Sequence, residues 1–202
     1  MEKKVGFNRR VSISVMEMAM NAAIEGTFTP EFATDLAMGM HQGENSVGKA
    51  KASIGRLTAK NPLLEYVKEH RQEYYEAIKH KGDRALVFTA LINATYEFGY
   101  DIVAILGKYF HVQEDIATSL IINKLSTMYT CNRYMLTALY YAMPMYIEAG
   151  LINRPEAGIY RKNELEIVTT FARDLYIKSF LINNPMFEWD DSHLEHPYFE
   201  FV

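Results

Sequence analysis

The chain has 202 residues, of which 49% are hydrophobic and 23% are charged, and this balance excludes a disordered protein. Its net charge of −4 does not mark it as a nucleic-acid binder, and its single cysteine, Cys131, excludes an internal disulfide framework and a multi-cysteine metal site. We expect Cys131 to be a buried or capping-region thiol in a protein of the reducing cytoplasm. The start lacks a signal-peptide pattern, and acidic residues interrupt the apolar windows 85–107 and 134–152, which predict buried helices rather than membrane spans.

The first third of the chain predicts short helices. Ser14-Val-Met-Glu17 forms a capping-box pattern that begins a helix, and Gly26 ends it. Thr29-Pro30-Glu31 combines a cap, a proline at the first helical position and an acid in the first turn. It therefore predicts a second helix, which stops near residues 41–43. Asn61-Pro62 begins a strongly periodic helix that continues toward residue 80.

Basic residues concentrate in one part of the chain, because Asn45–Arg84 contains nine basic and five acidic side chains. A basic patch on an acidic protein can bind phosphates, although a solvated helix face is the commoner case. A helix is predicted over residues 45–60. Its glycines, Gly48 and Gly55, allow close backbone approach to a neighbouring helix or to a phosphate, and helix packing is the commoner use.

The most apolar part, Asp83–Phe110, predicts two consecutive core helices with a break or kink at Gly99. Glu97 and Asp101 share a face only if the helix is continuous there. Such a pair could perform acid–base chemistry, but a solvent-facing or cation-paired role is commoner.

Residues 114–162 have the order of a helix-turn-helix followed by a wing. The two helices are predicted over 113–128 and 131–149, with Thr130 as the cap of the second, Pro144 as a bend and Gly150 as its end. Two short extended arms follow around 155–158. Asn163 is then predicted to cap a last helix over 164–182, and an aromatic, acidic tail packs back on the body or meets a partner.

Metal binding or catalysis has little support in the sequence. The tail carries possible metal ligands without a recognised spacing, and an acidic solvated tail is the commoner reading: Glu188, Asp190, Asp191, His193 and His196. No nucleotide-binding glycine loop, serine elbow or zinc-protease motif is present. We therefore predict no catalytic residues, no metal and no cofactor.

DNA binding has better support, because the first turn of the second helix in a helix-turn-helix enters the major groove. That turn contains Asn132 and Arg133, which are residue types that read adenine and guanine edges. Other cations could hold phosphates from the N-terminal arm, the basic helix, the helix before the turn and the wing. They are Arg9, Arg10, Lys49, Lys51, Arg56, Lys60, Lys124, Arg154, Arg161 and Lys162.

Together these patterns predict an all-α protein, a compact helical bundle with a helix-turn-helix or winged-helix-like C-terminal half. An N-terminal part, 1–82, would contain the basic helix. The rest, 83–202, would contain the core helices, the helix-turn-helix and the tail. The boundary is soft, and a single domain fits the sequence as well.

The order of segments resembles the BrxA-like proteins of BREX phage-defence systems. The resemblance covers most of the chain and lies in SVMEMAMNAAIEGTFTPEFATDLA, KAKASIGRLTAKNPLLEYV, RALVFTALINATYEFGYDIVAILGKYF, MLTALYYAMPMYIEAGLI and a closing helix followed by NNP. It implies a small helical accessory protein that binds double-stranded DNA without catalysis and works with other defence-system proteins. The alternative is a protein–protein adaptor that uses the tail and the apolar helices to join a larger complex.

Overall fold

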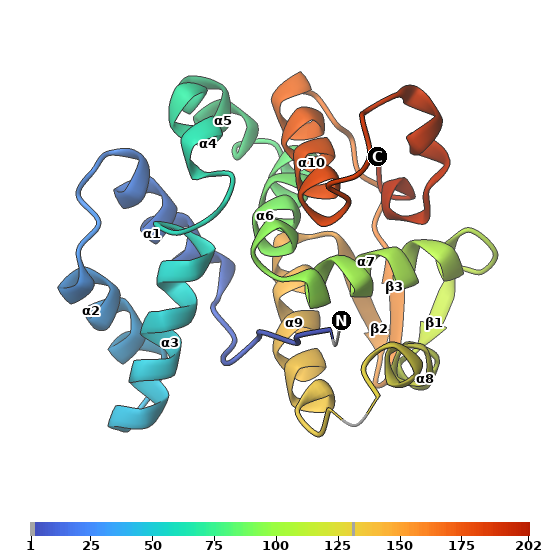
Figure 1. Cartoon of the computed structure of the whole chain (residues 1–202), viewed down its shortest axis with the longest axis horizontal. Coiled ribbons are helices and arrows are strands. Elements are labelled where there is room, and N and C mark those ends of the chain that lie inside the picture. Colours follow the sequence, from blue (N-terminus) through green and yellow to red (C-terminus); the bar gives the residue numbers. More distant parts are fainter. Residues whose placement is uncertain (1–2, 131) are drawn as a thin grey trace.

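The computed structural model describes residues 3–130 and 132–202, so the expectation for Cys131 lies outside the described residues. Within them the chain forms ten α-helices and one three-stranded sheet (Figure 1). The predominance of helix is as predicted, but the sheet corrects the all-α class.

Three helices form the N-terminal side of the molecule: α1 (Ile13–Ile24), α2 (Pro30–Met40) and α3 (Glu44–Leu57) (Figure 1). The predicted start of α1 was wrong, because its cap is Ser12, whose Oγ accepts from the Val15 N–H at 3.4 Å. The start of α2 is confirmed, since the Thr29 hydroxyl accepts from the Phe32 N–H at 3.1 Å. The basic helix is also confirmed as α3.

The middle of the chain contains two helix breaks that the sequence did not locate. The helix predicted after Asn61-Pro62 divides at His70 into α4 (Leu64–Glu69) and α5 (Arg71–Ala77). The long core helices are α6 (Lys81–Thr95) and α7 (Glu97–Phe110), separated by extended backbone at Tyr96 rather than at Gly99. Gly99 lies inside α7, where a Cβ would be 2.7 Å from the Tyr146 hydroxyl, so this glycine permits close helix packing.

The C-terminal half has a strand that the sequence did not predict. The chain runs through β1 (Asp115–Ala117), α8 (Thr118–Met128), α9 (Met135–Ala149), β2 (Ile152–Glu156) and β3 (Ile159–Lys162). The helices predicted over 113–128 and 131–149 are therefore both shorter at their starts. Thr130 does not cap α9, since the N-cap position is Tyr134 and has no side-chain cap.

Other predictions for this half are confirmed. Gly150 ends α9 with a left-handed φ of 91°, and the two extended arms form a hairpin. Pro144 lies within α9, and the bend expected there stays a prediction. The strands are antiparallel in the order β1-β3-β2, and Ile116 faces Tyr160 across β1 and β3. Both side chains are buried, so the first strand ties the region before α8 to the hairpin after α9.

The last helix, α10 (Thr170–Asn183), begins later than predicted because its cap is Thr169, not Asn163. The reason lies 85 residues earlier in the chain. The buried Asp83 carboxylate accepts from the Val168 N–H at 2.8 Å and from the Thr169 N–H at 2.9 Å. Residues 163–169 are thereby held in extended form against α6.

The tail packs back on the body of the molecule, which was one of the two alternatives predicted for it. Two 3₁₀ turns, η1 (Asp191–Glu195) and η2 (Pro197–Phe199), follow α10, and η2 packs on α7. One cluster of buried apolar side chains extends from Val5 to Phe201, and the boundary at residue 82 stays a prediction. No helix in the described part of the chain is long and apolar enough to cross a membrane.

Two helical glycines give a matched test of this packing. A Cβ at Gly82 would be 2.1 Å from the Glu166 carbonyl oxygen, whereas a Cβ at Gly48 would meet nothing within 4 Å. We expect Gly82→Ala to lower the free energy of unfolding by about 2 kcal/mol because the 163–169 segment must move. Gly48→Ala should raise it by about 0.5 kcal/mol through helix propensity. Urea unfolding measures both, and equal effects would contradict the packing described.

Candidate nucleic-acid interface

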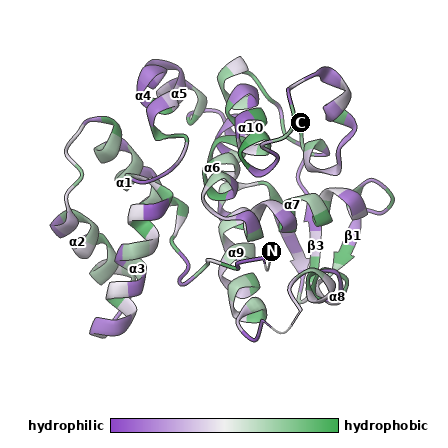
Figure 2. Ribbon diagram, viewed as in Figure 1, coloured by the Kyte–Doolittle hydropathy of each residue, from purple (hydrophilic) through white to green (hydrophobic). Residues whose placement is uncertain are grey.

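The exposed face of α9, the helix expected to read DNA, is apolar and aromatic. Between Met135 and Ala149 the helix contains no lysine or arginine. Its large exposed side chains include Leu136 and Tyr140, the latter 62% exposed. Figure 2 shows the contrast with α3, because purple hydrophilic stretches recur along α3 while α9 is largely pale to green. Helix α9 therefore has few groups for binding phosphates.

Asn132 and Arg133 lie in the turn before α9 and not in its first turn, which corrects the prediction. The Asn132 side-chain oxygen accepts from the Tyr134 N–H at 3.0 Å, so this side chain stabilises the turn. Arg133 is exposed, and so is Lys124 on the preceding α8. The two cations remain accessible at the α8–α9 end of the molecule.

The N-terminal arm is fixed to the body rather than free. The Arg9 guanidinium donates to the Tyr141 hydroxyl of α9 at 2.5 Å and to the Ser46 hydroxyl of α3 at 3.2 Å. Arg10 forms an ion pair with Glu148, which also accepts from the Ile13 N–H at 3.1 Å. The arm thus covers one side of α9, and the structure uses Arg9 and Arg10 in internal contacts.

Two of the three predicted wing cations are also paired. Arg161 donates through Nε and Nη2 to the two carboxylate oxygens of Asp115, both at 2.8 Å. Hydrogen bonds from Arg161 lower the pKa of the Asp115 carboxyl. The Lys162 ammonium lies 2.7 Å from Glu200 in the tail. Arg154 is exposed and forms no ion pair within residues 3–130 and 132–202.

The cations in and just after α3 are not paired internally, unlike those of the N-terminal arm. Lys49 and Arg56 on the helix and Lys60 in the turn just after it are exposed, and Lys51 is half-buried. None of the four forms an ion pair with another described residue. A 3.6-residue period places Gly48, Ala52 and Gly55 on one stripe of the helix.

This stripe corrects the expected use of its glycines. A Cβ at Gly48 or Gly55 would meet nothing within 4 Å, so neither glycine packs against a neighbouring helix. The stripe exposes the α3 backbone between cationic side chains. We call the face formed by Lys49, Lys51, Arg56, Lys60 and this stripe the α3 basic face.

The α3 basic face lies near the helix-turn-helix-like part. The Arg9 guanidinium joins Ser46, in the first turn of α3, to Tyr141 of α9. Figure 1 shows α3 and α9 starting at the same end of the molecule. The sequence alone did not indicate this arrangement, since the two helices are about 90 residues apart in the chain.

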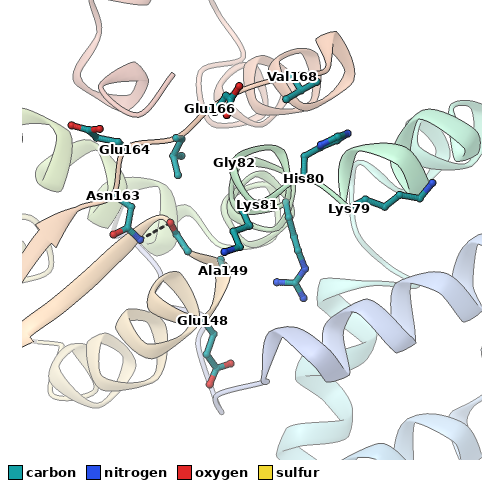
Figure 3. A pocket seen from close by; sticks show the side chains of 13 residues that line it. Lys79, His80, Lys81, Gly82, Glu148, Ala149, Asn163, Glu164, Glu166 and Val168 are labelled. Carbon is teal, nitrogen blue, oxygen red and sulfur yellow. Dashed lines mark hydrogen bonds between the residues drawn. The ribbon is translucent and has the colours of Figure 1, made fainter.

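A cavity of about 790 Å³ lies elsewhere, between the start of α6, the end of α9 and residues 163–168 (Figure 3). Lys81 extends into it, while the Glu164 and Glu166 carboxylates point away. Arg84 at its wall is paired with Glu17 at 2.8 Å, and Glu148 is paired with Arg10. Arg84 and Glu148 are therefore engaged in structural contacts.

The carboxylate pair of α7 is held by one cation, which confirms the cation-paired interpretation. The Lys3 ammonium lies 3.1 Å from Glu97 and 2.7 Å from Asp101, and the Tyr129 hydroxyl donates to Asp101 at 2.6 Å. Partial burial acts to lower the pKa of Lys3, but the two carboxylates raise it overall. The contacts tie the start of the chain to α7 and to the end of α8.

Asp190 and His196 stabilise the fold of the tail. The Asp190 carboxylate accepts from the Ser192 N–H at 2.8 Å and caps η1. His196 caps η2 by accepting from the Tyr198 N–H at 3.1 Å through Nδ1. No group of three or more His, Cys, Asp or Glu side chains in the described ranges is placed to hold a metal ion.

No family model, curated protein or solved structure matches this chain.

The cap formed by His196 predicts a pH dependence. Burial, and then the charge of the neighbouring His193, lower the pKa of His196 below 6.5. The cap needs the unprotonated form, because only an unprotonated Nδ1 can accept from the Tyr198 N–H. The stabilisation is therefore complete above about pH 6.5 and is lost as the pH falls below it. His196→Asn keeps an accepting cap without a titrating group. When the pH is lowered from about 7.5 to about 5.5, we expect the melting temperature of the His196→Asn variant to decrease less than that of the parent chain. Equal decreases of the two melting temperatures in calorimetry would contradict the capping role of His196.

Proposed function

We propose that this chain is a non-catalytic protein that binds double-stranded DNA mainly through the α3 basic face. The observation that carries the proposal is the set of cations on α3 and in the turn after it that have no ion-pair partners in the described chain. They lie beside Gly48 and Gly55, at which a Cβ would meet nothing within 4 Å. A helix with such a stripe can place its backbone close to a phosphate chain while lysine and arginine side chains reach phosphates on either side.

The order of the C-terminal elements supports the same class of protein. A strand, two helices and a hairpin follow α7, and the sheet order β1-β3-β2 brings the first strand beside the hairpin. We interpret this as a winged-helix-like unit with α8 and α9 as its helix pair and β2–β3 as its wing. Lys124, Arg133 and Arg154 would add contacts from this unit.

The proposed binding has little sequence preference. Base reading requires side chains that donate to or accept from base edges in the groove, and α9 presents mainly apolar and aromatic groups. Phosphate contacts are independent of sequence, and they predominate on α3. Of the twelve residues predicted from the sequence, we withdraw Arg9, Arg10, Arg161 and Lys162 as main contacts because the structure pairs them internally.

The resemblance to BrxA-like proteins extends the proposal to a biological setting. It supports a cytoplasmic accessory component of a BREX-type phage-defence system that acts with other defence-system proteins. The pairing of Arg84 with Glu17 and of Glu148 with Arg10 at the cavity between α6 and α9 fits a binding protein without a reaction of its own.

A protein–protein adaptor is the second candidate, and the tail favours it. Met186 is 92% exposed, and Leu194 is exposed nearby. Deleting residues 189–202 would not test this function, since it removes the buried Tyr198 and Phe199 from the core. The double substitution Met186→Asp and Leu194→Asp tests the adaptor function better than the deletion. Both side chains face solvent, so replacing them leaves the core intact.

A salt titration of duplex-DNA binding tests the main proposal. We expect the logarithm of the binding constant to fall linearly as the logarithm of the salt concentration rises. The slope of this line should become shallower by about 0.9 for each phosphate contact that is removed. Replacing Lys49, Lys51, Arg56 and Lys60 by alanine should therefore make the slope shallower by about 3.6.

The matched control replaces four cations away from the α3 basic face, namely Lys68, Arg71, Lys79 and Arg173. This variant has the same net charge as the first one. Fluorescence anisotropy with unrelated duplexes measures both. Absence of binding by the parent chain at low salt, or equal losses in the two variants, would contradict the proposal.

A further inference from the structure

An apolar groove lies between α9 and the turn of the β2–β3 hairpin. It has a volume of about 260 Å³, which is below the usual range of small-molecule sites, about 300–1,000 Å³, and suits one or two side chains. Its apolar lining consists of Tyr140, Met143, Pro144, Ile147 and Tyr160. Arg154 stands at its edge as the one cation of the described lining. We call this the Arg154 groove.

The groove is preformed. The Thr118 backbone N–H and hydroxyl both donate to the Gly158 carbonyl, at 2.8 and 3.0 Å, and fix the hairpin turn to the start of α8. Met143 and Tyr160 are buried, so the floor of the groove belongs to the core. A partner would meet a rigid surface and would not need to order it.

Pro144 adds a polar feature to this apolar surface. Proline has no N–H, so the Tyr140 carbonyl lacks the donor that position i+4 supplies elsewhere in a helix. Tyr140 and Pro144 both line the groove. The groove therefore combines apolar contact, a backbone acceptor and a guanidinium, which together fit a polypeptide segment with apolar and acidic side chains.

The chain itself carries such a segment. Residues Met186–Asp191 read MFEWDD, with Met186 92% exposed and Phe187 48% exposed. Glu188 and Asp191 are exposed acids beside them, and neither forms an ion pair among the described residues. Two exposed apolar side chains next to free carboxylates complement an apolar groove with one free guanidinium.

The segment cannot fill the groove of its own molecule without unfolding the tail. The Phe187 ring lies 6.1 Å from that of Phe180 on α10 and 5.1 Å from that of His193. The ion pair between Lys162 and Glu200 ties the tail to the C-terminal end of β3. The groove instead lies at Gly158, just before the N-terminal end of that strand. Figure 1 shows the tail beside α10, away from the start of α9.

We propose that the Arg154 groove binds the Met186–Asp191 segment of a second copy of this chain. The Met186 side chain, which is 92% exposed, enters the groove, and Glu188 or Asp191 pairs with Arg154. The association does not depend on DNA. If two copies dock reciprocally they form a closed dimer, and otherwise each copy docks on the next in an open chain.

Sedimentation equilibrium of the full chain in low-salt buffer without DNA tests this proposal. We expect a mass above that of the monomer that increases with protein concentration. Arg154→Glu, and separately Glu188→Lys with Asp191→Lys, should each raise the dissociation constant on the order of tenfold, because like charges then face each other. Combining the two sets restores opposite charges and should recover most of the association.

Arg71→Glu on α5 is the matched control, since it reverses one exposed cation away from both surfaces and should leave the association unchanged. All four substituted positions are exposed, so circular dichroism should show an unchanged fold. A monomer at every concentration, or self-association that neither charge reversal weakens, would overturn the proposal. Because DNA is absent, either result is independent of the DNA-binding function.

Discussion

A buried network around the Asn93 side chain holds the helices of this protein in one arrangement. Its oxygen accepts from the Tyr146 hydroxyl of α9 at 2.6 Å, and its nitrogen donates to the Tyr198 hydroxyl of the tail at 2.9 Å. Tyr198 also meets the Ser179 hydroxyl of α10 at 2.7 Å, and all four residues are fully buried. Burial raises the pKa of both tyrosines, which therefore remain protonated. Losing one partner would leave buried polar groups unpaired, so α6, α9, α10 and the tail are fixed together.

This constraint determines which surfaces remain for binding. Since α9 is anchored through Tyr146 and covered on one side by Arg9 and Arg10, only an apolar strip and the Arg154 groove stay accessible along it. The largest group of accessible cations lies on α3 and in the turn after it, beside a stripe of small residues that no neighbouring helix fills. We therefore propose that most phosphate contacts are made there, and that α9 and the hairpin contact protein.

Local patterns predicted much of the fold, and contacts distant in sequence account for most of the errors. The cap at Thr29, the stop at Gly150 and the hairpin depend on neighbouring residues, and all three are confirmed. The strand β1 is three residues long and exists through pairing with β3, more than 40 residues later. Likewise α10 starts at Thr170 because Asp83 holds the preceding backbone. The same limit applied to the candidate site, where charge alone could not reveal that Asp115 and Glu200 pair with Arg161 and Lys162.

The central claim is that α3, and not α9, is the main DNA-contacting helix. Hydrogen–deuterium exchange of the full chain with and without a saturating random-sequence duplex tests it most directly. The account predicts slower exchange of amides in Glu44–Leu57 when DNA is bound, together with unchanged exchange in the exposed part of α9 from Leu136 to Ile147. Protection of α9 without protection of α3 would contradict it.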